Sequence, residues 1–183
     1  PIDKKEAFKY YQMAADNGSV KASTITGNLL STGDGTAIDK KKAIEYYKYA
    51  ISKDDPIAMT KYALLLDYGN GVEVDKNEAL ILYGKAVDKG YDRAIRHLTA
   101  LLKKHKELNL NKKDLAQYYK KAADKGDDYS MFQYAEILFN EDATESSKKE
   151  AIKYYKMAAS KGNIDAMHRY GSQLITGNYI KKN

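Results

Sequence analysis

The sequence predicts an all-α solenoid in which about ten helices are arranged as antiparallel pairs. Three observations lead to this fold class. Identical residues recur every 36 positions, hydrogen-bond-accepting residues recur at the start of helix-length segments, and the apolar residues between them follow helical spacing. A repeat of this length forms one helix pair, and each pair must stack on its neighbours to bury its apolar faces.

The period is visible in three residue types. Tyrosine recurs at a spacing of 36 residues, alanine recurs three positions after it, and leucine repeats with the same period. The three sets are Tyr11, Tyr47, Tyr83, Tyr119 and Tyr155; Ala14, Ala50, Ala86, Ala122 and Ala158; and Leu30, Leu66, Leu102, Leu138 and Leu174. Chance does not produce three such sets in one register, so the chain is a tandem repeat.

One helix of each pair, which we call helix B, has a recognisable first residue. Side chains that can accept a hydrogen bond from a free backbone N–H recur at Asp3, Asp39, Asp75, Asn111 and Ser147. After three of these, a glutamate follows at the third position, which is the capping-box pattern: Glu6, Glu78 and Glu150. These five residues are therefore predicted to be the N-caps of the B helices.

The apolar pattern gives the course of both helices. Helix B carries a stripe such as Ala43, Ile44, Tyr46, Tyr47, Ala50 and Ile51, and it ends near a glycine suited to a left-handed C-terminal position. That glycine recurs at Gly18, Gly90, Gly126 and Gly162, whereas the second repeat has Asp54 there. A second stripe then defines helix A, for example Ala58, Tyr62, Ala63, Leu65 and Leu66. Small residues allow close approach of the two helices, and Tyr and Leu fill the space between pairs.

We expect a single repeat array over residues 1–183. Half repeats at 1–19 and 164–183 flank full repeats at 20–55, 56–91, 92–127 and 128–163. Asp3 and Asn183 fall at the same phase of the repeat, and the terminal helices carry apolar residues where a polar cap is usual: Phe8, Tyr11, Tyr170 and Leu174. The sequence therefore predicts a segment of a longer protein, flanked by more repeats or another domain.

The repeat resembles a known family. The residues that carry the resemblance are Ala58, Tyr62, Ala63, Leu66, Gly69, Asn70, Gly71, Val72, Asp75, Ala79, Tyr83, Ala86 and Gly90. This pattern is similar to that of the Sel-one-like repeat family, relatives of the tetratricopeptide repeats. The resemblance implies a right-handed α/α superhelical solenoid that serves as a protein-interaction scaffold or adaptor. Two connections, 103–107 and 140–144, lack the paired glycines found at 33–35 and 69–71, so we expect them to depart from the family's turn.

Composition argues against most catalytic chemistry. The chain has no Cys, which excludes disulfides, thiolate zinc sites and thiol nucleophiles. Its three histidines, His97, His105 and His168, lack metal-ligand spacing, and no apolar run is long enough to span a bilayer. We therefore expect a protein that is not an enzyme and has no cofactor or metal. The compartment is undetermined, although the absence of Cys fits the cytoplasm.

The resemblance implies that the A helices line a concave binding surface. The residues of helix A outside the apolar stripe then face the groove: Lys21, Thr24 and Asn28; Ile57, Thr60 and Leu64; Arg93, Arg96, Ala100 and Lys103; Tyr129, Phe132, Glu136 and Phe139; Asp165, His168 and Ser172. Cations beside aromatic residues suit an acidic peptide or domain with an apolar anchor. The predicted partner-binding residues are Arg93, Arg96, Lys103, Tyr129, Phe132, Phe139 and His168.

Three alternatives remain open. Phe132 and Phe139 could belong to the core instead of the groove. The array could be a structural linker in a larger assembly. Lysine runs and a net charge of +6 also allow nucleic-acid binding, although only three of the 31 basic residues are Arg and acidic residues interleave with the lysines. The runs lie at 40–42, 103–106, 112–113 and 148–149.

Overall fold

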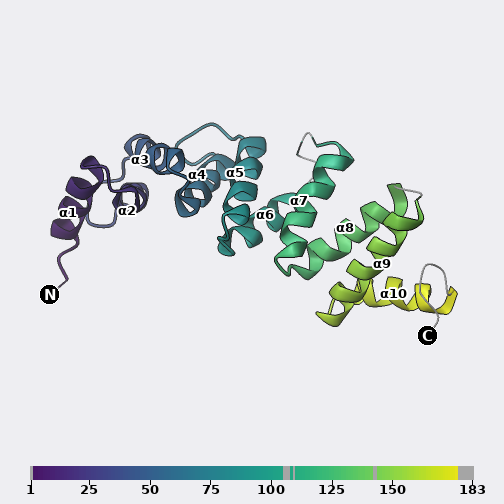
Figure 1. Cartoon of the computed structure of the whole chain (residues 1–183). Coiled ribbons are helices and arrows are strands. Elements are labelled where there is room, and N and C mark those ends of the chain that lie inside the picture. Colours follow the sequence, from purple (N-terminus) through teal and green to yellow (C-terminus); the bar gives the residue numbers. More distant parts are fainter. Residues whose placement is uncertain (1, 105–107, 109, 142–143, 177–183) are drawn as a thin grey trace. The chain divides into compact units, whose positions relative to one another are not determined.

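The protein is entirely helical in the part that the structure describes. The computed structural model describes residues 2–104, 108, 110–141 and 144–176, and these residues form ten α-helices and no strand (Figure 1). The helices are α1 (Lys4–Asp16), α2 (Val20–Thr32), α3 (Lys40–Ser52), α4 (Pro56–Tyr68), α5 (Lys76–Asp88), α6 (Arg93–Lys103), α7 (Lys112–Asp124), α8 (Asp128–Glu141), α9 (Glu145–Ser160) and α10 (Ile164–Thr176). The predicted helical repeat solenoid is confirmed, with B helices at odd numbers and A helices at even numbers.

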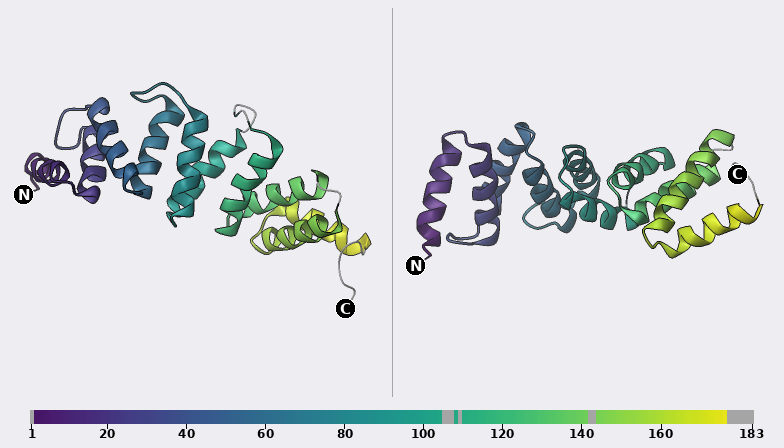
Figure 2. Two further views of the ribbon diagram at one scale, coloured as in Figure 1. Left: turned by 45° about the horizontal axis from the view of Figure 1, so that its top comes forward. Right: turned by 60° about the horizontal axis from the view of Figure 1, so that its bottom comes forward.

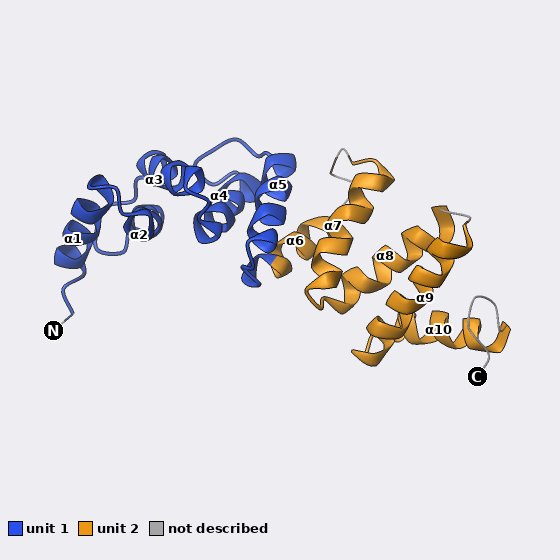
Figure 3. Cartoon of the chain, viewed as in Figure 1, with its two compact units in different colours: residues 1–94 blue, residues 95–183 orange. Residues whose placement is uncertain are grey.

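The chain divides into two compact units, residues 1–94 and residues 95–183 (Figure 3). Within the first unit, α2 packs between α1 and α3, and α4 packs between α3 and α5. Within the second unit, α8 packs between α7 and α9, and α9 packs against α10. A short connection folds α1 back along α2, as Figure 2 shows. Both units therefore use the same alternation of helix types.

The predicted N-caps of four B helices are confirmed. The side chains of Asp3, Asp39, Asp75 and Asn111 each accept a hydrogen bond from the backbone N–H three residues on. Ser147 was wrongly predicted for α9, whose N-cap is Thr144. The Thr144 hydroxyl accepts the N–H of Ser147 at 3.2 Å, so the helix begins three residues earlier than the repeat implied. Asn183 and parts of the connections at 103–107 and 140–144 lie outside the described residues.

The left-handed residue that follows each helix B is also where the pattern placed it. Gly18, Gly90, Gly126 and Gly162 have φ between 82° and 98°. In the second repeat Asp54 takes this conformation with φ of 64°, as the only residue other than glycine with positive φ in the described part of the chain. A Cβ atom is disfavoured in the left-handed region, and Asp is among the residues that tolerate it best. The turn geometry is thus kept although glycine is absent.

Buried tyrosines join each helix B to the helix A before it. Tyr47, Tyr83, Tyr119 and Tyr155 are at most 1% exposed. The Tyr47 ring of α3 lies so close to Gly27 of α2 that a Cβ atom there would come within 2.8 Å of Tyr47 Cε1. Positions equivalent to Gly27 hold Ala63, Thr99 and Ala135, which are at most 5% exposed. The Tyr47–Gly27 contact sets a large ring against a small residue, and the equivalent positions keep a residue no larger than Thr.

The same tyrosine position is open on α1. Tyr11 is 41% exposed, in contrast to its four equivalents. On α10, Leu174 is 52% exposed, whereas the equivalent Leu30 and Leu66 are 4% and 6% exposed. The apolar stripe is buried only where a neighbouring helix lies against it, as expected when each repeat contacts only its neighbours.

This difference in burial predicts that replacing the tyrosine by alanine destabilises the fold by different amounts at the two positions. Tyr83→Ala should lower the free energy of unfolding by about 3–5 kcal/mol, because it removes a buried aromatic ring and leaves a cavity. Tyr11→Ala, at the equivalent position of the repeat, should cost less than about 1 kcal/mol because the ring is largely solvated. Urea denaturation followed by circular dichroism measures both. Equal losses for the two variants would contradict this account of the packing.

A second prediction concerns Asp54. Asp54→Gly should raise the free energy of unfolding by about 0.5 kcal/mol, because glycine relieves the left-handed strain. The gain is partly offset by the loss of the exposed ion pair between Asp54 and Lys89, whose charged atoms lie 2.7 Å apart. Gly90→Ala is the control of opposite sign: no atom lies near its added Cβ, so only backbone strain acts, at about 1 kcal/mol. Thermal melts of both variants test this: the melting temperature should rise in Asp54→Gly and fall in Gly90→Ala.

Candidate functional site

A hollow of about 230 Å³ lies on the A helices of the first unit, between α2 and α4. Its lining includes four residues that the repeat alignment placed on the groove side: Lys21, Thr24, Asn28 and Ile57. Ile25, Asp55 and Lys61 complete it. The A helices of two successive repeats therefore form a shared concavity in this unit.

The lining follows from helix geometry. Lys21 and Ile57 occupy equivalent positions, as do Ile25 and Lys61, and each pair of residues on one helix is four positions apart. Residues at this spacing lie one above the other on the same face. Each helix thus presents one Lys and one Ile, in opposite order. The alignment missed Ile25 and Lys61, although one helical turn from 21 and 57 was a signal that could have found them.

Some polar groups of the hollow are already used within the fold. The Thr24 hydroxyl donates to the carbonyl oxygen of Val20 at 3.3 Å, and the Asp55 carboxylate caps α4 by accepting the N–H of Ala58 at 2.7 Å. Neither Lys21 nor Lys61 has an ion-pair partner among the described residues. Two ammonium groups are therefore available beside an aliphatic surface.

In the second unit, the structure brings together two of the predicted residues, Lys103 and Tyr129. Nζ of Lys103 lies 4.3 Å from the centre of the Tyr129 ring, which is a cation–π distance. The Tyr129 ring also meets Tyr119 edge to face, with ring centres 6.2 Å apart. Tyr129 is half-buried and Lys103 exposed, so this pair connects the interior to the surface of α6 and α8.

Phe132 and Phe139 both contact one buried ring, that of Tyr155. Their ring centres lie 6.0 Å and 6.2 Å from that of Tyr155. The Tyr155 hydroxyl donates to Glu136 at 2.6 Å, and Glu136 pairs with the guanidinium of Arg169. Both phenylalanines are half-buried. Each therefore supports the α8–α9 contact and still offers part of its ring to the surface.

The remaining predicted residues are exposed. Arg93 belongs to the first unit, and Arg96 lies on α6 in the second. His168 lines a hollow of about 500 Å³ on α10, together with Met167, Gly171, Ser172, Ile175 and Thr176. Lys103 and Tyr129 thus contact each other, and Phe132 and Phe139 each contact Tyr155, while these three stand as separate surface groups.

A third hollow, of about 470 Å³, lies on the B helices α1 and α3. Its charged lining is mixed, with Asp16, Lys42 and Glu45. The Tyr46 hydroxyl donates to Asp16 at 2.6 Å, and burial together with this bond raises the pKa of Tyr46. The Tyr49 hydroxyl donates to the Gly18 carbonyl at 3.1 Å, so both tyrosines of this lining serve contacts between segments of the fold.

Burial changes the titration of two tyrosines in the second unit. Burial raises the pKa of Tyr134 to about 12, and burial and the bond to Glu136 raise the pKa of Tyr155 as well. These hydroxyls stay protonated at neutral pH and act as neutral hydrogen-bond partners. Their role is to hold helices together.

The described residues form no metal-binding cluster and no membrane-spanning helix. Among them, no group of three or more His, Cys, Asp or Glu side chains could hold a metal ion. His97 is half-buried, and His105 lies outside the described residues. None of the described helices combines the length and apolarity that crossing a bilayer requires.

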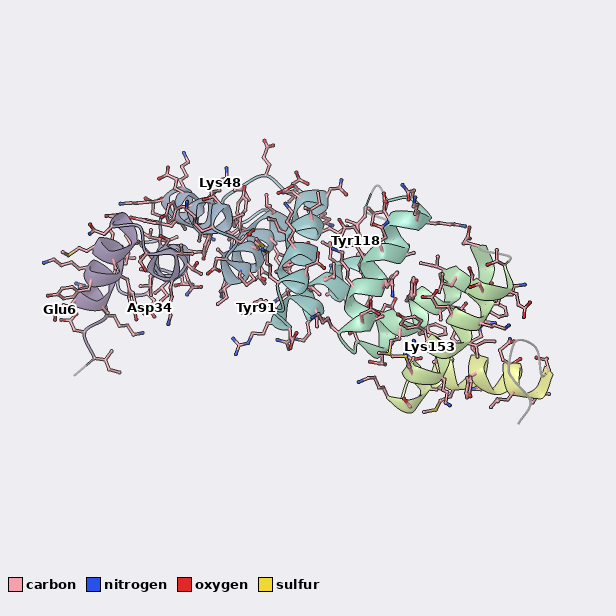
Figure 4. All side chains as sticks on the ribbon, viewed as in Figure 1. Glu6, Asp34, Lys48, Tyr91, Tyr118 and Lys153 are labelled. Carbon is pink, nitrogen blue, oxygen red and sulfur yellow. The ribbon has the colours of Figure 1, made fainter. Side chains whose placement is uncertain are left out.

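Surface charge is interleaved in sign. Side chains of both signs project from the chain, among them Glu6, Lys48 and Lys153 on helices and Asp34 in the connection between α2 and α3 (Figure 4). Several lysines are engaged in exposed ion pairs, such as Lys4 with Asp34 at 2.8 Å. Exposed pairs of this kind contribute little to stability. They do place acidic side chains beside some of the lysines.

Comparison with solved structures finds the same fold. A protective antigen of uropathogenic Escherichia coli that displays an SLR fold superimposes with a TM-score of 0.61 and 21% identity, over 99% of this chain. This chain spans 39% of the length of that protein. A Sel1 repeat protein from Oxalobacter formigenes has a TM-score of 0.60 and 28% identity, covering 97% of this chain and 72% of its own. A search of curated proteins gave no match.

The family assignment rests on the sequence match. The model of the Sel1 repeat matches residues 1–19, 22–55, 56–91, 116–127 and 128–163, which is well over half of the chain. The interval between 91 and 116 is not matched, and it contains α6 and a connection without the paired glycines. The matched segments contain the recurrent tyrosines described above. The chain belongs to the Sel1 repeat family.

Proposed function

We propose that this array is a non-catalytic scaffold that binds protein partners on the exposed side of its A helices. Sel1 repeats are commonly protein-interaction scaffolds. The observation that carries the proposal is the hollow between α2 and α4, where the A helices of successive repeats join into one concave, partly apolar surface with unpaired lysines. Stacked repeats offer extended surfaces of this kind to partners.

The second unit supports the same proposal. Lys103 on Tyr129 and the half-buried rings of Phe132 and Phe139 lie on A helices, and exposed Arg96 lies on α6, the helix that carries Lys103. Aromatic and Arg side chains are the residues that most often dominate binding energy in interfaces. We propose that an acidic partner with an apolar anchor contacts these residues, with Arg93 and His168 as additional contacts on their own helices.

The experiment compares variants on the two helix types. The double variant Phe132→Ala with Arg96→Ala should lose at least tenfold in captured partner when immobilised chain is incubated with extract from its native source and analysed by quantitative mass spectrometry. The control is Lys9→Ala with Tyr10→Ala, which changes two exposed residues of the B helix α1. This variant should capture as much partner as the parent chain. Helical circular dichroism and melting temperature are measured for both.

The outcome separates groove from core. Because both phenylalanines contact Tyr155, a lowered melting temperature together with unchanged capture would mean that Phe132 serves packing alone. Capture lost in the helix B control and retained in the helix A variant would move the binding surface to the other side of the array and refute the proposal.

The lysine content motivates a second measurement. If the net charge of +6 served nucleic-acid binding, affinity for DNA or RNA would fall steeply with salt, as counterion release requires. Since acidic side chains lie beside some of the lysines, we expect weak binding at low salt that is lost at physiological salt. Fluorescence anisotropy with labelled oligonucleotides over a salt series tests this. Submicromolar affinity at physiological salt would favour the nucleic-acid alternative.

A further inference from the structure

We infer that the hollow between α2 and α4 is an anchor site for a peptide segment in which acidic residues flank an aliphatic side chain. This inference rests on the proposed scaffold function and names the chemistry of one partner. It concerns the first unit, whereas the predicted aromatic residues lie in the second. The described lining residues are Lys21, Thr24, Ile25, Asn28, Asp55, Ile57 and Lys61.

Size favours a side chain over a whole small molecule. Sites that enclose small molecules usually measure about 300–1,000 Å³. The hollow measures about 230 Å³ and is open to solvent. An opening of this size on a protein surface suits the insertion of one anchoring side chain, with the rest of the segment lying across the helices.

Aliphatic surface favours an aliphatic anchor. Ile57 is 41% exposed and Ile25 is half-buried, and both line the hollow. Covering them removes apolar area from water, which is favourable. The neighbouring Thr24 hydroxyl is satisfied by the Val20 carbonyl, so an apolar occupant leaves no unpaired hydroxyl there. The lining contains no aromatic ring on which a nucleic-acid base could stack.

Charge favours acidic flanking residues. Lys21 and Lys61 have no ion-pair partners in the described structure, and the Asn28 side chain can donate further hydrogen bonds. The Asp55 carboxylate is the one acidic group in the lining, and the N-terminus of α4, which it caps, offsets its charge. Complementary charge at the edge of an interface chiefly improves selectivity and association rate. Acidic segments are therefore preferred over basic ones.

The Lys and Ile pairing is specific to these two repeats. The positions equivalent to Lys21 and Ile25 hold Ile57 and Lys61 in α4, but Arg93 and His97, Tyr129 and Gln133, and Asp165 and Arg169 in the later A helices. The combination is therefore not a by-product of the repeat's packing, which depends on other positions. It distinguishes the α2–α4 surface from the rest of the array.

The test selects peptides without assuming a natural partner. A phage-displayed library of random peptides is selected on the immobilised chain, and enriched peptides are synthesised for titration. We expect Asp or Glu next to Leu, Ile, Val or Met. Affinity should fall at least tenfold in Lys21→Glu with Lys61→Glu, and also in Ile57→Ala. The control Lys9→Glu with Lys41→Glu changes two exposed lysines on B helices by the same total charge and should bind within twofold of the parent.

Methyl spectroscopy locates the peptide. In a chain labelled at the isoleucine δ1 methyl groups, the peptide should shift the signals of Ile25 and Ile57 and leave that of Ile152 in α9 unchanged. Because the substituted side chains are on the surface, circular dichroism melts should match those of the parent. This keeps a loss of affinity distinct from a loss of folding.

Several results would overturn the inference. These are enrichment of basic peptides, failure to enrich any peptide, affinity unaffected by the hollow variants, or equal binding of a single-stranded RNA of matched charge. Peptides that respond to Phe132→Ala with Arg96→Ala and not to the hollow variants would refute this site and leave the scaffold proposal standing. If the chain enriches no peptide and captures no protein, both the inferred peptide site and the proposed scaffold function are refuted.

Discussion

The fold depends on one contact, the insertion of a helix B tyrosine against a small residue of the preceding helix A. Tyr47 meets Gly27, and the equivalent tyrosines are almost completely buried in each repeat that has a helix A before them. A ring can approach the backbone this closely only where the facing residue lacks a large side chain. The contact therefore limits how closely the two helices can approach, and the equivalent positions before the other buried tyrosines hold Ala63, Thr99 and Ala135, none larger than Thr.

Local sequence determines most of the secondary structure for the same reason. Caps, apolar stripes and left-handed glycines all repeat with the period of that contact, so the ten helices could be predicted with their type and order. Prediction was wrong at Ser147, because Thr144 offers an equivalent hydroxyl one turn earlier and three further residues can join the helix. A cap depends on a hydrogen bond within three residues, and two competing acceptors are not distinguished by periodicity alone.

The proposed binding surface could be predicted only in part. The repeat alignment placed Lys21, Thr24, Asn28 and Ile57 on the groove side, and they line one hollow, but it missed Ile25 and Lys61. Phe132 and Phe139 could not be assigned from the sequence, because an aromatic ring on a helix satisfies either role. Their half-buried rings against Tyr155 show why: at the edge of a stacked pair, one side chain can serve both packing and surface.

The exposed positions of helix A can vary in residue type because other positions hold the repeats together. Since the tyrosine and its small partner hold the repeats together, the residues one face away can differ between repeats without disturbing the stack. The chain uses this freedom unevenly, with Lys and Ile on α2 and α4, and with cations and aromatic rings on α6 and α8. A solenoid whose packing positions repeat while its exposed positions diverge can present different chemistry in each repeat. Recognition by such an array is then decided by which repeats a partner covers, more than by the fold that all repeats share.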